Sequence, residues 1–242
     1  MSIWRTLIGG AAGFAIGGPL GAILGGVAGH VLDKKSSSRK NLSNQSDQMA
    51  FTLAVIVLGA KMAKADGSVS AQEIQAFKEV FHVPEQDMQN VGKIFDQAKK
   101  DSKGFEPYAR QIAELFKNRR KALEDLLDGL FHIAKADNIL HQSEIEYLRQ
   151  VSVIFGFNSN EFSIIKERHN SSGLSDPYKI LGLENGANFT EVKNKYKQLI
   201  KEYHPDKLIA QGVPKELIDV ANRKLSSIND AYDRIEKMQS DK

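Results

Sequence analysis

The chain has 242 residues, of which 41% are hydrophobic and 26% are charged. This is an ordinary composition for a globular protein, and the length allows one large domain or two small ones. The net charge of +3 is too small for a general nucleic-acid-binding protein, although local basic stripes are compatible with it. The chain contains no cysteine. Disulfides, thiolate zinc sites and a cysteine nucleophile are therefore excluded, and a reducing compartment such as the cytoplasm is expected for the folded part.

Residues 1–33 are predicted to form a glycine-rich membrane anchor. No Asp, Glu, Lys or Arg occurs between residues 6 and 32, and about 20 apolar residues suffice to cross a bilayer as a helix. Six glycines recur at every fourth position, which predicts a face of small residues along which two membrane helices pack as a homodimer. They are Gly9, Gly13, Gly17, Gly21, Gly25 and Gly29. A flexible glycine-rich tail and a cleaved signal peptide are the alternatives; the length of the segment and the lysines after it argue against the signal peptide.

The stretch 34–48, "KKSSSRKNLSNQSDQ", is polar and serine-rich and is predicted to be a linker. It contains Lys34, Lys35, Arg39 and Lys40, whereas only Arg5 precedes the apolar segment. Basic residues concentrate on the cytoplasmic side of membrane helices. We therefore expect a single membrane pass, with everything after the linker in the cytoplasm.

Residues 49–168 are predicted to form an all-helical domain of six to seven helices, because no convincing alternating strand pattern occurs there. The domain contains an internal repeat: "AKADGSVSAQEI" begins at Ala63 and "AKADNILHQSEI" begins at Ala134. The repeat matches Asp66 with Asp137 and Glu73 with Glu144. Two halves with matched acidic residues suggest a pseudo-symmetric bundle in which the two loops converge.

The four repeated carboxylates have two readings. Brought together, they would suit a divalent cation that prefers oxygen ligands. In the structural alternative, Ser70 and Glu73 have the spacing of a capping box, in which the glutamate accepts from an otherwise unpaired helix amide, and Asp66-Gly67 is a turn. The first loop is also too short for an EF-hand. No other cofactor is expected.

The segment from about Gln48 to Asn170 resembles the TerB-like (tellurite-resistance-associated) domain, an all-helical module with the same duplicated "ADG…E" motif. The resemblance implies that the four repeated carboxylates are candidate metal ligands. Asn138 replaces the glycine of the motif in the second copy, which is a departure from the family pattern.

After a second linker at 169–176, residues 177–242 are predicted to form a helical hairpin. The first long helix is expected to begin at Thr190, a favourable N-cap. Its apolar positions have helical spacing and are Val192, Tyr196, Leu199, Ile200 and Tyr203. Its outer face carries three lysines four residues apart, with Lys195 beside them. These three, called the basic face below, are Lys193, Lys197 and Lys201. Like charges at this spacing repel each other, so the face is either an ordinary solvated surface or a surface for an acidic partner.

Pro205 is predicted to end this helix, because proline lacks an amide hydrogen and restricts the residue before it. His204 and Asp206 then lie on a turn at the end of the basic face. A further helix is expected from Pro214. Its apolar residues recur every three or four positions and are Leu217, Ala221, Leu225, Ile228, Tyr232 and Ile235. Packed antiparallel on the first helix, it would leave the His-Pro-Asp turn at the tip of a hairpin.

Three stretches of this region resemble the J-domain of DnaJ-type co-chaperones: "DPYKILGL" from Asp176, "KNKYKQLIKEYHPDK" from Lys193 and "LSSINDAYDRI" from Leu225. The resemblance implies a partner, a DnaK-type chaperone ATPase whose ATP hydrolysis the J-domain triggers. It implies that the basic face and Lys207 attract this partner electrostatically. It also implies that the turn formed by His204, Pro205 and Asp206 is the trigger, with the aspartate paired to an arginine of the partner.

The order of membrane segment, TerB-like domain and C-terminal J-domain resembles the DjlA type of bacterial co-chaperone. This implies a protein that recruits a cytoplasmic chaperone ATPase to the inner membrane, with no nucleic-acid partner. An enzyme is not expected, because no nucleophile accompanies His204 and Asp206, and no phosphate loop, zincin motif or dinucleotide fingerprint occurs. The alternative is a metal-responsive sensor of envelope stress, with the TerB-like domain as receiver and the J-domain as output.

Overall fold

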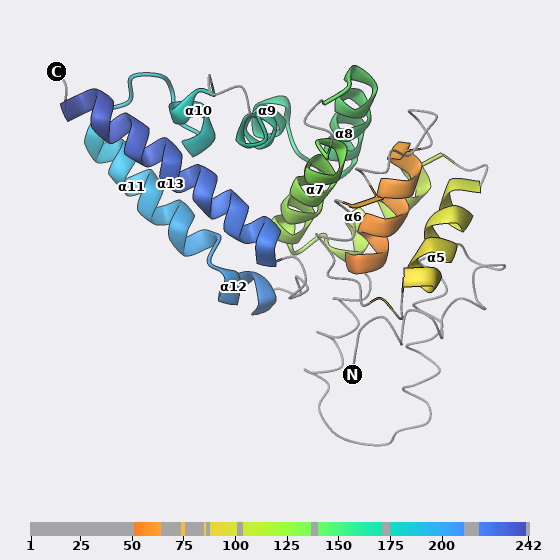
Figure 1. Cartoon of the computed structure of the whole chain (residues 1–242). Coiled ribbons are helices and arrows are strands. Elements are labelled where there is room, and N and C mark those ends of the chain that lie inside the picture. The colour runs from red at the N-terminus through yellow and green to blue at the C-terminus, as the bar shows by residue number, and fades with distance from the viewer. Residues whose placement is uncertain are drawn as a thin grey trace, which may run out of the picture.

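The computed structural model describes residues 51–63, 74–75, 85, 88–100, 104–136, 140–170, 175–210 and 218–240. Throughout these ranges the regular structure is helical and contains no strand (Figure 1), which confirms the predicted all-α class. The predicted membrane anchor with its six glycines lies outside these ranges. Within them, no helix combines the length and the apolar character needed to cross a bilayer.

The central domain is built around a buried helical segment at 51–63, in which every residue is buried, as the apolar sequence predicts. The same domain contains α5 (Met88–Lys100), α6 (Glu106–Leu115), α7 (Arg120–Ala134), α8 (Gln142–Ile154) and α9 (Ser159–Arg168). A hydrogen bond of 2.8 Å from the Tyr147 hydroxyl to the Leu58 carbonyl joins α8 to the central segment. The apolar residues Leu126, Leu127 and Leu130 of α7 are fully buried and belong to the same core.

The C-terminal hairpin consists of α10 (Pro177–Leu181), α11 (Phe189–Glu202), α12 (Pro205–Ala210) and α13 (Ile218–Ser240). In Figure 1, α11 and α13 lie side by side and run in opposite directions, and α10 packs on both of them. Ile228 and Ile235 of α13 are fully buried against Val192 and Leu199 of α11. The predicted antiparallel packing is thus confirmed.

Two local predictions in the hairpin were wrong. The N-cap of α11 is Asn188, whose side-chain oxygen accepts from the Glu191 N–H at 3.0 Å, so Thr190 lies inside the first turn. α11 ends at Glu202, before Pro205, as predicted, but Asp206 does not lie on a turn, because Pro205 begins α12 and Asp206 is in its first turn. Both cases follow from the preference of asparagine for N-cap positions and of proline for the first helical position. The predicted helix start at Pro214 lies outside the described residues.

The hairpin packs directly on the central domain. α13 contacts α7 and α9, and α10 contacts α9 (Figure 1). Leu208 of α12 and Val220 and Ala221 of α13 belong to the same buried apolar cluster as the helices of the central domain. This contact brings the end of α11 next to α7.

Candidate partner-binding site

The His-Pro-Asp turn connects α11 to α12. The His204 carbonyl accepts from the N–H groups of Lys207 at 3.0 Å and Leu208 at 3.2 Å. The His204 Nδ1 atom accepts from the N–H of Asp206 at 3.3 Å. His204 therefore caps α12, and Pro205 takes the first helical position, where a missing N–H has no consequence. The three residues thus form the compact start of a short helix.

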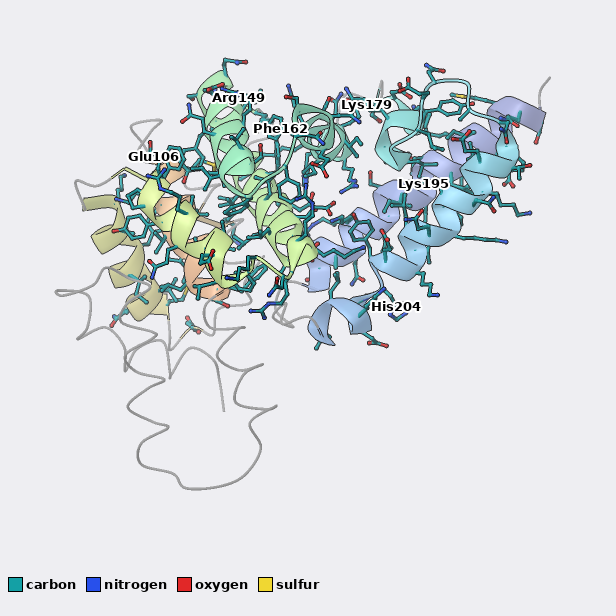
Figure 2. All side chains as sticks on the ribbon, turned by 180° about the vertical axis from the view of Figure 1, so that it is seen from behind. Glu106, Arg149, Phe162, Lys179, Lys195 and His204 are labelled. Atoms are coloured by element: carbon teal, nitrogen blue, oxygen red, sulfur yellow. The ribbon has the colours of Figure 1, made fainter. Side chains whose placement is uncertain are left out.

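The side chains of this turn point into solvent. The His204 side chain is 57% exposed and that of Asp206 is 90% exposed. The two side chains lie beside each other, with 3.8 Å between His204 Nδ1 and Asp206 Oδ2. Figure 2 shows His204 where α11 gives way to α12. An exposed carboxylate of this kind is available for a charge-assisted hydrogen bond to an external guanidinium group.

The basic face lies beside the turn on the exposed side of α11. Lys193, Lys197, Lys201 and also Lys207 are exposed, and none of them has an ion-pair partner among the residues that the structure describes. Lys195 is half-buried and lines a cleft between α11 and the central domain. The central domain therefore covers one side of α11 and leaves the basic face and the turn open.

Of the four predicted metal ligands, one lies among the described residues. Asp66, Glu73 and Asp137 lie outside the described residues. Glu144 is 3% exposed, and its Oε2 accepts from the His141 N–H at 2.9 Å, which is the reciprocal half of a capping box. No group of three or more candidate ligands that could hold a metal ion occurs in the described part of the chain.

The contact between the two domains contains a set of charged groups that sequence reasoning missed. The Lys224 ammonium group of α13 is only 2% exposed and lies among three carboxylates of α7. Its Nζ is 2.8 Å from Asp128 Oδ2, 3.0 Å from Glu124 Oε1 and 3.2 Å from Asp125 Oδ1. A buried ammonium group needs compensation of this kind, because desolvation disfavours its charged form.

Two residues at the end of α9 and one at the end of α11 complete this arrangement. Arg168 Nη1 is 2.6 Å from Glu124 Oε1, and His169 Nε2 is 2.8 Å from Asp128 Oδ1. The Tyr203 hydroxyl is 2.9 Å from both carboxylate oxygens of Glu124. We call Glu124, Asp125, Asp128, Arg168, His169 and Lys224 the ionic cluster. It contains one more carboxylate than it has permanent cations.

The charges of the ionic cluster shift one another's protonation. Burial raises the pKa of Asp125 to about 6, against the opposing effect of Lys224. Burial also acts to raise the pKa of Glu124, but Lys224 and Arg168 outweigh it and lower this pKa to about 2. For Asp128, burial is likewise outweighed by Lys224 and the hydrogen bond with His169, which hold its pKa well below the usual range. Asp125 is therefore the carboxylate of the cluster that takes up a proton first.

One sequence signal could have revealed the cluster. Lys224 falls on the buried register of α13, whose buried positions are Val220, Ala221, Lys224, Ile228, Ala231 and Ile235. A lysine at such a position predicts a buried counter-charge, since lysine is almost never fully buried without a partner. The carboxylates of α7 gave no comparable signal, because acidic residues on an amphipathic helix normally face solvent.

A helical hairpin with an exposed His-Pro-Asp turn at the end of a basic face defines the chain as a J-domain protein, the class of the DnaJ-type co-chaperones. Family models agree with this in chain order: the DjlA co-chaperone transmembrane domain matches residues 1–44, the tellurite resistance protein TerB matches residues 52–167, and the DnaJ domain matches residues 176–240. The chain thus resembles the DjlA type of co-chaperone in the identity and the order of its three matched domains.

Curated relatives align over most of the chain. The co-chaperone protein DjlA of Photobacterium profundum is 27% identical in an alignment of 275 positions, which covers 97% of this chain and 98% of the relative. DjlA of Coxiella burnetii is 27% identical, with 85% of this chain and 83% of the relative covered. DjlA of Shewanella oneidensis is 27% identical, with 97% of both chains covered. No solved structure matches the chain significantly.

Proposed function

We propose that this co-chaperone stimulates the ATPase of a cytoplasmic DnaK-type chaperone through the His-Pro-Asp turn and the basic face, and recruits that chaperone to the inner membrane. The observation that carries the proposal is the exposure of the turn and of all three lysines of the basic face, although the hairpin packs on a second domain. That packing uses the opposite side of α11. A partner can therefore approach without separating the two domains.

The two parts of the surface have different tasks in this proposal. The unpaired lysines generate a positive potential, which steers an acidic surface toward the hairpin and speeds association. The turn supplies a directional contact, because the exposed Asp206 carboxylate can pair with an arginine. The chain itself hydrolyses nothing. It favours the hydrolysing conformation of its partner by binding that conformation more tightly.

The test is single-turnover ATP hydrolysis by a DnaK-type ATPase with the purified full-length chain in detergent. Wild-type chain is expected to accelerate hydrolysis, and His204→Gln is expected to abolish the acceleration without a change in the far-UV circular dichroism. Glu146→Gln, which alters only exposed contacts with Arg149 and Gln150 on α8, is the control and should accelerate as the wild type does. Failure of the wild-type chain to accelerate hydrolysis would refute the proposal.

The basic face calls for a separate measurement. Lys197→Ala combined with Lys201→Ala is expected to raise the chain concentration that gives half-maximal acceleration, and higher ionic strength should have the same effect on the wild type. Lys237→Ala, at an exposed position in the last turn of α13, is the matched control. If the double variant needs the same concentration as the wild type for half-maximal acceleration, the basic face is only a solvated surface and does not attract the partner.

The membrane arrangement completes the proposal. A single pass through the bacterial inner membrane, with the domains after residue 48 in the cytoplasm and a homodimer formed by the glycine face, is supported by the glycine spacing and by the transmembrane family model over residues 1–44. Gly17→Leu with Gly21→Leu should abolish cross-linking between two chains in native membranes. Cross-linking that persists in this double variant would exclude the glycine face as the dimer interface.

A further inference from the structure

The His-Pro-Asp turn lies between two residues that are buried against the central domain. Tyr203, directly before the turn, is 5% exposed, and Leu208, two residues after it, is 0% exposed. Tyr203 ends α11, where its N–H donates to the Leu199 carbonyl at 2.9 Å, and Leu208 belongs to the apolar cluster that includes the helices of the central domain. Residues 204–207, of which all but the half-buried Pro205 are exposed, thus lie between two anchored positions.

The anchor before the turn is held by charged groups. The Tyr203 hydroxyl hydrogen-bonds the Glu124 carboxylate of α7, and the Lys224 Nζ atom lies 3.8 Å from the centre of the Tyr203 ring. Lys121 of α7 lies 4.6 Å from the same ring centre. Glu124 is itself fixed by Arg168. The ring therefore has a defined position relative to α7, because both its polar tip and its face are engaged.

The anchor after the turn is apolar. Leu208 lies in α12 and is buried together with Val220 and Ala221 at the start of α13, the part of α13 that also carries Lys224. The apolar contacts of Leu208 and the ionic contacts of Tyr203 therefore lie on the same side of the hairpin. Between them, the side chains of the turn have few contacts of their own.

An ionic arrangement of this kind is not needed merely to hold two domains together. Buried ion pairs are often no more stabilising than apolar residues of similar volume, and their best attested role is to specify one geometry. The cluster specifies the position of Tyr203, one residue before the turn. It does so without covering the turn or the basic face.

We propose that the central domain sets the conformation of the His-Pro-Asp turn, with Glu124 as a positioning residue that acts through Tyr203. The inference rests on the proposed function, because the turn is taken to be the element that triggers the partner ATPase. It assigns to the TerB-like domain a direct part in the activity of the J-domain. Loss of the Glu124–Tyr203 contact would leave the basic face intact and release the turn.

The test separates positioning from folding by titrating the ATPase with full-length chain in detergent. Glu124→Gln and Tyr203→Phe are each expected to lower the maximal acceleration at saturation by roughly 5- to 20-fold, since a displaced contact group costs rate rather than encounter. The half-saturating concentration should change by less than about twofold, because the basic face is untouched. The double variant should be no worse than the more severe single variant, as expected for two residues that act through one contact.

A merely structural role gives a different result. Partial unfolding reduces the amount of active chain, so it raises the half-saturating concentration and leaves the maximal acceleration unchanged. That outcome, or additive losses in the double variant, would overturn the inference. Glu146→Gln, which alters only exposed contacts with Arg149 and Gln150 on α8, is the control and should match the wild type in both quantities. Should Glu124→Gln not fold, Tyr203→Phe alone decides, because it removes a single oxygen atom.

Hydrogen exchange gives a readout that does not need the partner. The backbone amides of Asp206, Lys207 and Leu208 should exchange at least about tenfold faster in Glu124→Gln than in the wild type, with the amides of α11 unchanged. Unchanged exchange in the turn would refute positioning even if the chain stimulates the ATPase. Conversely, faster exchange with no stimulation by the wild-type chain would refute the proposed function and retain the structural coupling.

Discussion

Replacing Lys224 with methionine is expected to destabilise the contact between the two domains strongly and in a pH-dependent way. Methionine keeps most of the volume of the lysine stem and removes the ammonium group. The three carboxylates of α7 that lie within 3.2 Å of Lys224 Nζ then lose their common cation. Arg168 still compensates Glu124, so the loss falls mainly on Asp125 and Asp128.

The magnitude follows from burial. Lys224 is 2% exposed, and removal of one partner from a buried ion pair costs about 3–5 kcal/mol. In a folded body of this size, about 1 kcal/mol corresponds to roughly 2–4 °C in Tm, which predicts a decrease on the order of 6–20 °C at pH 8. Lys179→Met is the matched control at the same domain contact. Lys179 is 39% exposed and 3.6 Å from Glu167, so its loss should cost about 0–1 kcal/mol.

The dependence on pH distinguishes charge from packing. Without Lys224, the folded-state pKa values of Asp125 and Asp128 rise above those of the unfolded chain, since burial then acts with less opposition. Acids with a raised folded-state pKa favour folding as the pH falls through that value. The difference between variant and wild type, measured by thermal unfolding of the full-length chain, should therefore be smaller at pH 5 than at pH 8. A loss below about 1 kcal/mol, or an equal loss at both pH values, would refute the ionic account.

Three further outcomes are expected. Burial raises the pKa of Asp125 from 3.8 to about 6, so its ionised form opposes folding above pH 6. Asp125→Asn should therefore raise Tm at pH 8 by the equivalent of about 1–3 kcal/mol and flatten the gain in stability between pH 8 and pH 5. A lower Tm at pH 8 would contradict this expectation. Gly182 has a φ of 72°, and a Cβ added there would lie 3.4 Å from a side chain, whereas Gly186 has a φ of 84° and free space around it. Gly182→Ala and Gly186→Ala should each lower the free energy of unfolding by about 1–2 kcal/mol, Gly182→Ala by more, as measured by thermal unfolding. Variants as stable as the wild type would contradict the requirement for a left-handed backbone at these positions. Divalent-cation binding by the repeat loops stays a prediction, and calorimetry with Ca²⁺ or Mg²⁺ should give heat that disappears in Asp66→Ala with Asp137→Ala; heat that is absent or unchanged would exclude it.

The hairpin could be predicted from the sequence because its signals are local. The spacing of Val192, Leu199 and Tyr203 indicates one helix face, and all three are buried. The start of the same helix was missed, because Asn188 and Thr190 are both favourable N-caps. The choice between them depends on tertiary packing: the Phe189 ring stacks on Tyr232 of α13 at 6.0 Å between centroids, which places this residue inside the helix.

The ionic cluster could not be predicted in the same way, because its burial arises only when two domains meet. Asp125 and Asp128 belong to α7, whose apolar face already packs in the core of the central domain. Nothing in the hydrophobic periodicity of α7 shows that α13 will cover these two residues. The one informative residue is Lys224, a charge in an apolar register. Its three partners lie almost 100 positions earlier in the sequence, for example 99 from Asp125, and no local pattern links such positions.

The placement of this cluster gives the domain order a physical meaning. An apolar contact alone would hold α13 on α7 but would tolerate small displacements, because dispersion and burial have little directionality. Hydrogen bonds between charged groups are short and directional, so the cluster fixes the register of the contact one residue before the His-Pro-Asp turn. A change in the central domain that moves Glu124 would therefore reach the turn through Tyr203, while the exposed lysines of the basic face would continue to attract the partner. In the proposed function, attraction would thus rest on the basic face and triggering on the turn, and only the turn would depend on the central domain.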